Sequence, residues 1–200
     1  MRSLGFALAM ALTVWSFTAS ARATQTLLAP TAASQSFADR LVTAARDQGK
    51  SFALYTPAYV KIPYPGGDVP AYTGVCTDVV IRAYRALGID LQVEIHKSGV
   101  GSGDTNIDHR RVEVQRKFFS RKAKSLPVST NPKDYKPGDI VTFHLAKGWF
   151  SNTHVAIVSD KLTSDGTPLV IHNRGFGVQE ENWLFSEKIT GHFQYRPISD

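Results

Sequence analysis

The chain has 200 residues, and its 23 Lys and Arg against 17 Asp and Glu give a formal net charge of +6. Its single cysteine excludes an internal disulfide framework. The length suits one domain with its own core, and the basic balance favours a polyanionic partner, although the sequence contains no nucleic-acid-binding motif.

The first residues have the pattern of a secretory signal peptide. Arg2 is followed by an uncharged apolar run over residues 4–17 and then by a small-residue cleavage motif, Ala-Arg-Ala. We predict that residues 1–23 are removed by cleavage after Ala23, with Ala21 as the competing site. The run is shorter than the roughly 20 residues that a membrane anchor needs. The mature chain is therefore expected to be periplasmic or secreted, without integral membrane association.

The segment after the signal peptide predicts a lead, a helix and an irregular stretch. Residues 24–35 are expected to form a flexible lead, and residues 36–200 a single domain. Ser36 is a suitable N-cap for a helix that ends before Gly49. The Pro-, Gly- and Tyr-rich residues 51–74 predict irregular structure that leads to the cysteine.

Cys76 lies at the start of the next predicted helix. Apolar residues recur at helical spacing from Cys76 to Leu87, and Gly88 stands where a helix commonly ends. Residues 90–97 fit two structures, because they alternate like a strand while Asp90 is also a suitable helix cap.

The second half changes from helical to alternating periodicity. After a Gly-rich loop over residues 98–111, a basic amphipathic helix is predicted for residues 112–124. Strands are predicted at residues 139–145, 153–158, 168–173 and 192–196. Helices followed by strands indicate the α+β class.

The single thiol can be interpreted as a reactive group or as an inert one. An unpaired cysteine in an exported protein is buried and inert, bonded to another chain, or kept for its reactivity. At the first turn of a helix, Cys76 is close to unpaired N–H groups and the positive end of the helix dipole, which favour the thiolate. Asp78 opposes this effect, unless it caps the helix or binds a cation. A thiolate nucleophile also needs a base and a group that orients the base.

Two histidines on consecutive predicted strands supply the base and the orienting group. The assumed register pairs Val158 with Pro168, Ala156 with Val170, and His154 with His172. The two imidazoles would then be neighbours on one face, which we expect to meet the cysteine helix. A slip of one residue would make Asn173 the third member instead. The alternative for each histidine alone is a hydrogen-bonded residue of the sheet.

Several strings in this part of the chain resemble a known superfamily. PGDIVTF, THVAIVSD and LVIHN are similar to the sheet of NlpC-type papain-like cysteine peptidases. In that superfamily a cysteine opens a helix, a His-Val-x-Ile strand supplies the base, and the next strand supplies a polar third residue. The matching positions here are Cys76, His154 and His172. CTDVVIRAY, DTNIDHRR and the HN pair more closely resemble an uncharacterised family of bacterial exported proteins in that superfamily.

The resemblance implies a papain-like fold, hydrolysis of amide bonds in peptidoglycan or its peptide fragments, and no cofactor or metal. One difference concerns the residues beside the nucleophile. NlpC-type enzymes usually have Asp before the cysteine and Ser-Gly after it, whereas Val75 precedes Cys76 here and Thr77 and Asp78 follow. The usual Asp is associated with recognition of a free amine in the stem peptide.

Four residues are predicted to contact the substrate. Tyr72 could donate to an oxyanion together with the Cys76 amide, and Asp78 lies close to the nucleophile in sequence. Arg110 or Arg111 could clamp a carboxylate, because a guanidinium binds carboxylates through two parallel hydrogen bonds. The two arginines could equally be structural partners of the nearby aspartates in DTNIDHRR.

Three other functions remain open at this point. Papain-like relatives with the same Cys/His pair carry out acyl transfer. A metal hydrolase could use His144, His154 and His172, although their spacing matches no helical zinc motif. A non-catalytic wall-binding module would need only the basic surface, with Cys76 packed in the core. A thiol pKa well below about 8.5 would favour catalysis over that module.

Overall fold

The computed structural model describes residues 35–51, 53–148 and 151–196. The predicted signal peptide and nearly all of the predicted lead lie outside the described residues. Within these ranges, no helix is long and apolar enough to cross a bilayer. The helices are α1 (Phe37–Asp47), α2 (Cys76–Ala86), α3 (Leu91–Ser98) and α4 (Val112–Lys122). The strands are β1 (Leu54–Tyr55), β2 (Thr73–Gly74), β3 (Lys124–Ser125), β4 (Ile140–His144), β5 (Thr153–Leu162), β6 (Pro168–Asn173), β7 (Val178–Glu181) and β8 (Lys188–Gln194).

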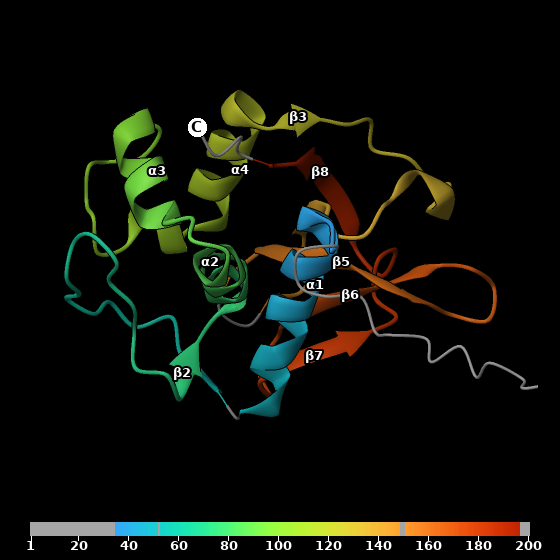
Figure 1. Ribbon diagram of the computed structural model, residues 1–200, viewed down its shortest axis with the longest axis horizontal. Coiled ribbons are helices and arrows are strands. Elements are labelled where there is room, and N and C mark those ends of the chain that lie inside the picture. The colour runs from blue at the N-terminus through green and yellow to red at the C-terminus, as the bar shows by residue number, and fades with distance from the viewer. Residues whose placement is uncertain (1–34, 52, 149–150, 197–200) are drawn as a thin grey trace, which may run out of the picture.

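The centre of the fold is a six-stranded antiparallel sheet in the order β3-β8-β4-β5-β6-β7. Helices α2, α3 and α4 gather on one side of this sheet, and α1 lies alongside α2 and β5 (Figure 1). A separate parallel pair, β1 and β2, stands just before α2. The predicted α+β class is confirmed.

Apolar side chains fill the space between the helices and the sheet. Helix α2 contributes Val79, Val80 and Ala83, and Cys76 belongs to the same buried cluster. From the sheet, Val155 and Ile157 of β5 belong to this cluster too. Cys76 therefore starts a helix whose apolar face is fixed against the central strand.

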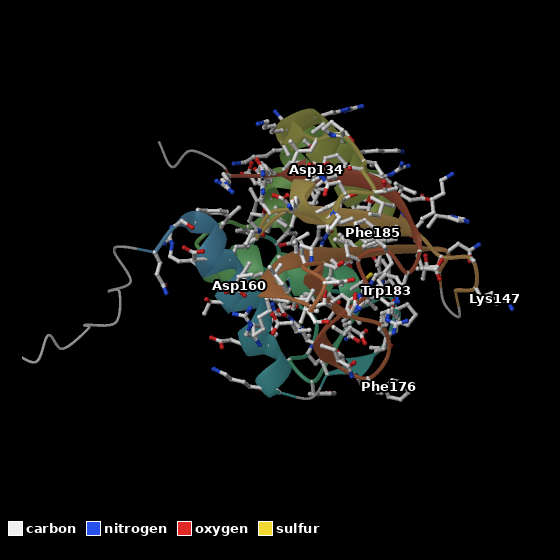
Figure 2. The ribbon with its side chains drawn as sticks, turned by 90° about the vertical axis from the view of Figure 1, so that its right-hand side faces the viewer. Asp134, Lys147, Asp160, Phe176, Trp183 and Phe185 are labelled. Atoms are coloured by element: carbon white, nitrogen blue, oxygen red, sulfur yellow. The ribbon has the colours of Figure 1, made fainter. Side chains whose placement is uncertain are left out.

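A second, smaller core covers the opposite face of the sheet. The alternate residues of β5, Ala156 and Val158, pack there with Trp183 and Leu184. Figure 2 shows Trp183 on this face, with α2 and α3 behind the sheet. His154 has the same strand parity as Ala156, so its side chain is on this second face. The expectation that the histidine face meets the cysteine helix is therefore wrong.

Most of the predicted elements occur with small shifts in their ends. Ser36 caps α1, accepting a hydrogen bond from the Asp39 N–H. The ambiguous residues after Asp90 form helix α3, because the Asp90 carboxylate accepts the Gln92 N–H at 2.9 Å and Gly99 ends the helix with a φ of 65°. Strand β6 has the predicted bounds, β5 runs on to Leu162, and α4 ends two residues early. Strand β8 begins four residues before its predicted start, and strands β3 and β7 were not predicted.

The hairpin between β5 and β6 has a different register from the predicted one. Ile157 pairs with Ile171 and Val158 with Val170, which is two residues from the assumed pairing, and an irregularity follows Val158. A shift by an even number keeps each side chain on its face. His172 therefore remains on the same face as His154, in a diagonal position instead of directly opposite.

Candidate active site

The start of α2 is fixed by a carboxylate in its own first turn. Oδ2 of Asp78 accepts the Val75 N–H at 2.7 Å, which satisfies a donor at the helix entrance. The same carboxylate is bonded by Arg110, whose Nε and Nη2 lie 2.9 and 3.0 Å from its two oxygens. Both side chains are 2% exposed. Asp78 thus has a structural role, and both of its oxygens accept hydrogen bonds from the protein.

The thiol of Cys76 is buried among hydrogen-bond donors. Its Sγ accepts from the N–H groups of Val155 and Thr77 and from the Tyr55 hydroxyl, and the residue is 3% exposed. Burial raises the pKa of the Cys76 thiol to about 11; the Val155 N–H lowers the pKa, whereas the negative charge of Asp78 raises it further. The expected lowering of the thiol pKa by the helix N-terminus is therefore outweighed by burial. The criterion of a low thiol pKa, which would favour catalysis over a wall-binding module, is not met, so the case for catalysis depends on a base for the thiol proton. In this resting arrangement the sulfur carries its proton.

The Val155 contact joins the first residue of α2, on one face of the sheet, to the strand that carries His154 on the other face. N–H groups of a strand point along the sheet towards the neighbouring strand, not out of its faces. The pairing of β5 with β6 begins at Ile157, so the Val155 N–H lies outside the paired part of these two strands. The sulfur thus lies at the level of the strand backbone, beside the peptide that joins His154 to Val155.

The two predicted histidines are in direct contact. Nε2 of His154 lies 2.8 Å from Nδ1 of His172, and both residues are buried. The other ring nitrogen of His172, Nε2, lies 2.8 Å from Oε1 of Glu181. His154, His172 and Glu181 come from the neighbouring strands β5, β6 and β7, so the sheet itself sets their order.

Both imidazoles are held in their neutral form by burial. Burial, and then the nearby His172 and Arg174, hold the pKa of His154 well below its usual range. Burial also lowers the pKa of His172 to about 3, with Arg174 contributing. The Trp183 ring packs against both, with centroid separations of 5.3 Å to His154 and 5.0 Å to His172. A neutral imidazole can act as a general base for a thiol that comes within its reach.

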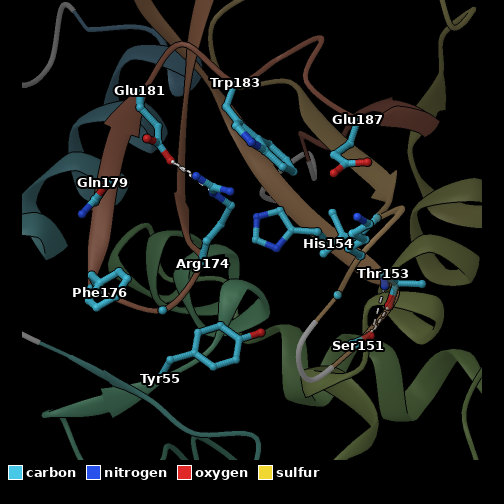
Figure 3. Close-up of a pocket in the computed structure, with 15 residues that line it drawn as sticks. Tyr55, Ser151, Thr153, His154, Arg174, Phe176, Gln179, Glu181, Trp183 and Glu187 are labelled. Carbon is cyan, nitrogen blue, oxygen red and sulfur yellow. Dashed lines mark hydrogen bonds and ion pairs between the residues drawn. The ribbon is translucent and has the colours of Figure 1, made fainter.

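Two cavities are lined by the residues of this arrangement. One, of about 520 Å³, is lined by His154, Trp183 and Phe176. Figure 3 shows the imidazole of His154 between the Trp183 ring and Tyr55, with Phe176 at the side. Phe176 is 82% exposed, so it stands at the mouth of the cavity.

The second cavity, of about 530 Å³, is lined by Cys76, Arg110 and Arg111. Tyr55, together with Ser151 and Thr153, lines both cavities. The two cavities therefore share this part of their walls, with His154 lining the first and Cys76 lining the second.

The structure separates the roles of the two arginines. Arg110 is the buried partner of Asp78, not of the aspartates in its own segment, and its Nη1 donates to the Ala58 carbonyl at 3.2 Å. Arg111 is 55% exposed at its side chain and lies 3.8 Å from Asp108. Of the two predicted carboxylate clamps, only Arg111 has a free face towards the cavity of Cys76.

We therefore expect opposite results from alanine at these two positions. Arg110→Ala leaves the Asp78 charge buried without a partner, which should lower the free energy of unfolding by about 3–5 kcal/mol. Arg111→Ala removes an exposed side chain and should change it by less than about 0.5 kcal/mol. Urea titrations of both variants measure the difference; equal stability of the two would contradict the structural role of Arg110.

Three other predicted positions need correction. Tyr72 is 67% exposed and lines neither cavity, and the tyrosine hydroxyl at the sulfur belongs to Tyr55. Asn173 accepts the Gly175 N–H at 3.0 Å in a turn, and His172 occupies the position beside His154. His144 follows Phe143, the direct partner of His154, so it points to the opposite face and the three histidines proposed as metal ligands do not converge.

The buried neutral histidines predict a loss of stability in acid. Burial lowers the pKa of His109 to about 4 as well, so three histidines titrate below the usual 6.5. Below pH 6.5 the unfolded chain takes up protons at these positions and the folded chain does not. The free energy of unfolding should therefore fall by on the order of 1.4 kcal/mol per pH unit for each histidine, and stay level above pH 6.5.

Urea unfolding at pH values between 7.5 and 5 measures this slope. His172→Gln should reduce the slope of the free energy of unfolding against pH by the contribution of one histidine. Replacement of the exposed His144 by Gln should leave this slope unchanged. A free energy of unfolding that stays constant from pH 7.5 to 5 would show that the histidines are not buried in neutral form.

Sequence reasoning missed two residues of this site. Glu181 lies on a short polar strand, VQEE, whose residues do not alternate in hydrophobicity, so no periodicity marked it. Trp183 follows in the loop after that strand. Tyr55 lies in the Tyr-rich stretch before the cysteine, and the parallel pairing of Tyr55 with Gly74 brings it to the entrance of α2.

The chain is similar to a family model, to a bacterial protein and to a solved structure. A family model described as "Domain of unknown function (DUF1287)" matches residues 42–195. Uncharacterized protein YijF of Escherichia coli (strain K12) is 48% identical over 163 residues, which cover 76% of this chain and 78% of that protein. A crystal structure from Staphylococcus aureus, described as similar to a lipoprotein of the NLP/P60 family, aligns with 16% identity and a TM-score of 0.41. That alignment covers 82% of this chain and 44%, less than half, of the solved protein.

Proposed function

The chain belongs to the family described as a domain of unknown function, DUF1287, and from this premise we propose that it is an exported cysteine hydrolase that cleaves amide bonds in peptidoglycan stem peptides. One observation carries the proposal. The thiol of Cys76, at the N-terminus of a helix, is bonded to the N–H next to His154, and His154 is itself held by His172 at 2.8 Å. The structure thus offers a nucleophile in Cys76, a base in His154 and a group that orients the base in His172.

The chemistry follows from the neutral resting state. Sγ of Cys76 attacks the carbonyl carbon of the amide while His154 takes the thiol proton. The same imidazole then gives this proton to the leaving amine, which departs and leaves a thioester on the sulfur. Water attacks the thioester in a second round of base catalysis and restores the thiol. His172 orients His154 throughout, and Trp183 shields both rings from solvent.

We assign to Tyr55 the role of oxyanion donor that was predicted for Tyr72. Its hydroxyl already lies at Sγ, so a carbonyl carbon bonded to that sulfur would place its oxygen within reach of the same donor. Together with the Cys76 amide at the first turn of α2, the Tyr55 hydroxyl would stabilise the negative charge on this oxygen. Tyr55 also remains a proton donor at neutral pH, because burial raises its pKa.

The cavities support a peptide substrate with a carboxylate. Arg111 is the exposed cation beside Cys76, and its ion pair with Asp108 is long, at 3.8 Å. A substrate carboxylate could replace that weak contact with a bidentate one. The net positive charge and the predicted signal peptide support an anionic partner outside the cytoplasm, for which peptidoglycan is the match implied by the sequence resemblance. We place the mature chain in the periplasm or in the secreted fraction.

Digestion of purified sacculi tests the proposal. The mature chain, beginning at Thr24, is incubated with sacculi, and the released muropeptides are identified by mass spectrometry. Shortened stem peptides with new carboxyl and amino ends are the expected products. Conjugates without free ends would show acyl transfer, and an unchanged sacculus that nevertheless binds the protein would show a wall-binding module; either result overturns the hydrolase.

A further inference from the structure

A buried histidine pair ends on a carboxylate that no sequence pattern predicted. Glu181 accepts from Nε2 of His172 through Oε1, the oxygen that also lies 3.2 Å from Nε and Nη2 of Arg174. The dashed contact between Arg174 and Glu181 is visible in Figure 3. With both neighbours directed at one oxygen, Glu181 is anchored on the side of β7 that faces the histidines.

These contacts determine which nitrogen of each ring carries hydrogen. An ionised carboxylate only accepts hydrogen bonds, and Arg174 is also a donor, so Nε2 of His172 must be protonated. In a neutral imidazole the other nitrogen, Nδ1, is then an acceptor. Nε2 of His154, at 2.8 Å from it, must be the donor of that contact. Nδ1 of His154 is left with the lone pair.

We propose that Glu181 is a positioning residue that fixes the tautomers of His172 and His154, so that Nδ1 of His154 is the base. The inference deepens the proposed function and rests on it, because Nδ1 is the nitrogen left to receive the proton of Cys76. Without the carboxylate, His172 could adopt the opposite tautomer and donate through Nδ1. Nε2 of His154 would then have to accept, and its Nδ1 would carry hydrogen and could not take the thiol proton.

The same carboxylate acts during the reaction. As Sγ attacks, the S–H bond breaks and a new N–H bond forms at Nδ1 of His154, so this ring becomes an imidazolium. No other proton has to move. The positive charge is formed in a buried place, where a carboxylate one histidine away stabilises it more than it would in water. Loss of Glu181 should therefore slow the chemical step and leave substrate binding almost unchanged.

Ring-nitrogen NMR of the histidine-labelled protein tests the tautomers directly. In the wild-type chain at neutral pH, His154 and His172 should both be protonated at Nε2 and unprotonated at Nδ1. Glu181→Gln offers His172 a donor and an acceptor, so its tautomer should become mixed. A wild-type His172 that carries hydrogen on Nδ1, or a tautomer that Glu181→Gln leaves unchanged, would overturn the proposal.

Kinetics of the same variants provide the second measurement. Glu181→Gln should lower kcat by about 10–100-fold with KM nearly constant, as for other residues that orient a functional histidine through a hydrogen bond. Glu180→Gln is the matched control, because Glu180 is adjacent but bonds Arg46 and Lys161 instead of a histidine. Its kcat should equal that of the wild type. Equal kcat values for the two variants would contradict the role of Glu181.

The two measurements separate this inference from the proposed function. NMR needs no substrate, so the predicted tautomers in a protein that fails to cleave sacculi would leave the hydrogen-bond chain intact and reject the hydrolase. Cleavage by a protein in which His172 has the opposite tautomer would support the hydrolase and reject the role of Glu181.

Discussion

Replacement of Cys76 by alanine is expected to lower kcat for cleavage of sacculi by about 10⁴-fold or more. Under the assay conditions the remaining rate should equal that of the uncatalysed reaction. The sulfur is the only thiol in the chain and the atom that forms the thioester, so no neighbouring group can replace it. The fold should tolerate the change, because removal of one buried sulfur costs about 1 kcal/mol. Release of muropeptides over time measures the rate.

Two controls make this result specific. The thermal midpoint of Cys76→Ala should stay within a few degrees of that of the wild type, which separates loss of chemistry from loss of fold. Cys76→Ser retains a hydroxyl of similar size but a much weaker nucleophile and should be almost as inactive. Turnover by Cys76→Ala at the wild-type rate would remove the thiol from the mechanism.

Replacement of His154 by alanine should lower kcat by about 10²–10⁴-fold, the usual contribution of a positioned acid or base. The neutral thiol makes this dependence strong: with a pKa raised to about 11, Cys76 has little thiolate at neutral pH and needs a base to take its proton. In the variant the rate should rise with pH, because hydroxide must then supply the thiolate. In the wild type it should be level from about pH 6.5 to 9.

His144→Ala is the matched control for this variant. His144 is an exposed histidine of β4 whose direct partner, Thr153, precedes His154 in the chain. Since its side chain points to the opposite face, its loss should leave kcat and the pH profile unchanged. A drop in activity for His144→Ala equal to that of His154→Ala would instead support a site shared by several histidines.

The elements that position the site could be foreseen where local patterns are strong. Capping by Ser36 indicated the start of α1, and the helical spacing of apolar residues from Cys76 indicated α2. Alternation in the run PLVIHN indicated β6. The face of β5 could not be assigned in this way, because both of its alternating sets are apolar: Val155 and Ile157 pack under the helices, and Ala156 and Val158 pack on the other side. Only the tertiary arrangement decides which set meets α2.

The contact between His154 and His172 could be predicted from the sequence, whereas the residues that support this pair could not. His154 and His172 were brought together in spite of the register error, because the irregularity after Val158 shifted the pairing by two residues and not by one. The partner of Asp78 lies 32 positions away, at Arg110, where no local rule points. Glu181 was missed for the same reason: its contact with His172 exists only once β7 has joined the sheet.

The most direct measurement is the intact mass of the protein during turnover. Mature chain mixed with soluble stem peptides and quenched in acid should carry a covalent acyl group on Cys76, which hydroxylamine removes and which Cys76→Ala lacks. We predict that this thioester forms on Cys76. Release of cleaved peptides by a protein that never carries an acyl group on Cys76 would contradict it.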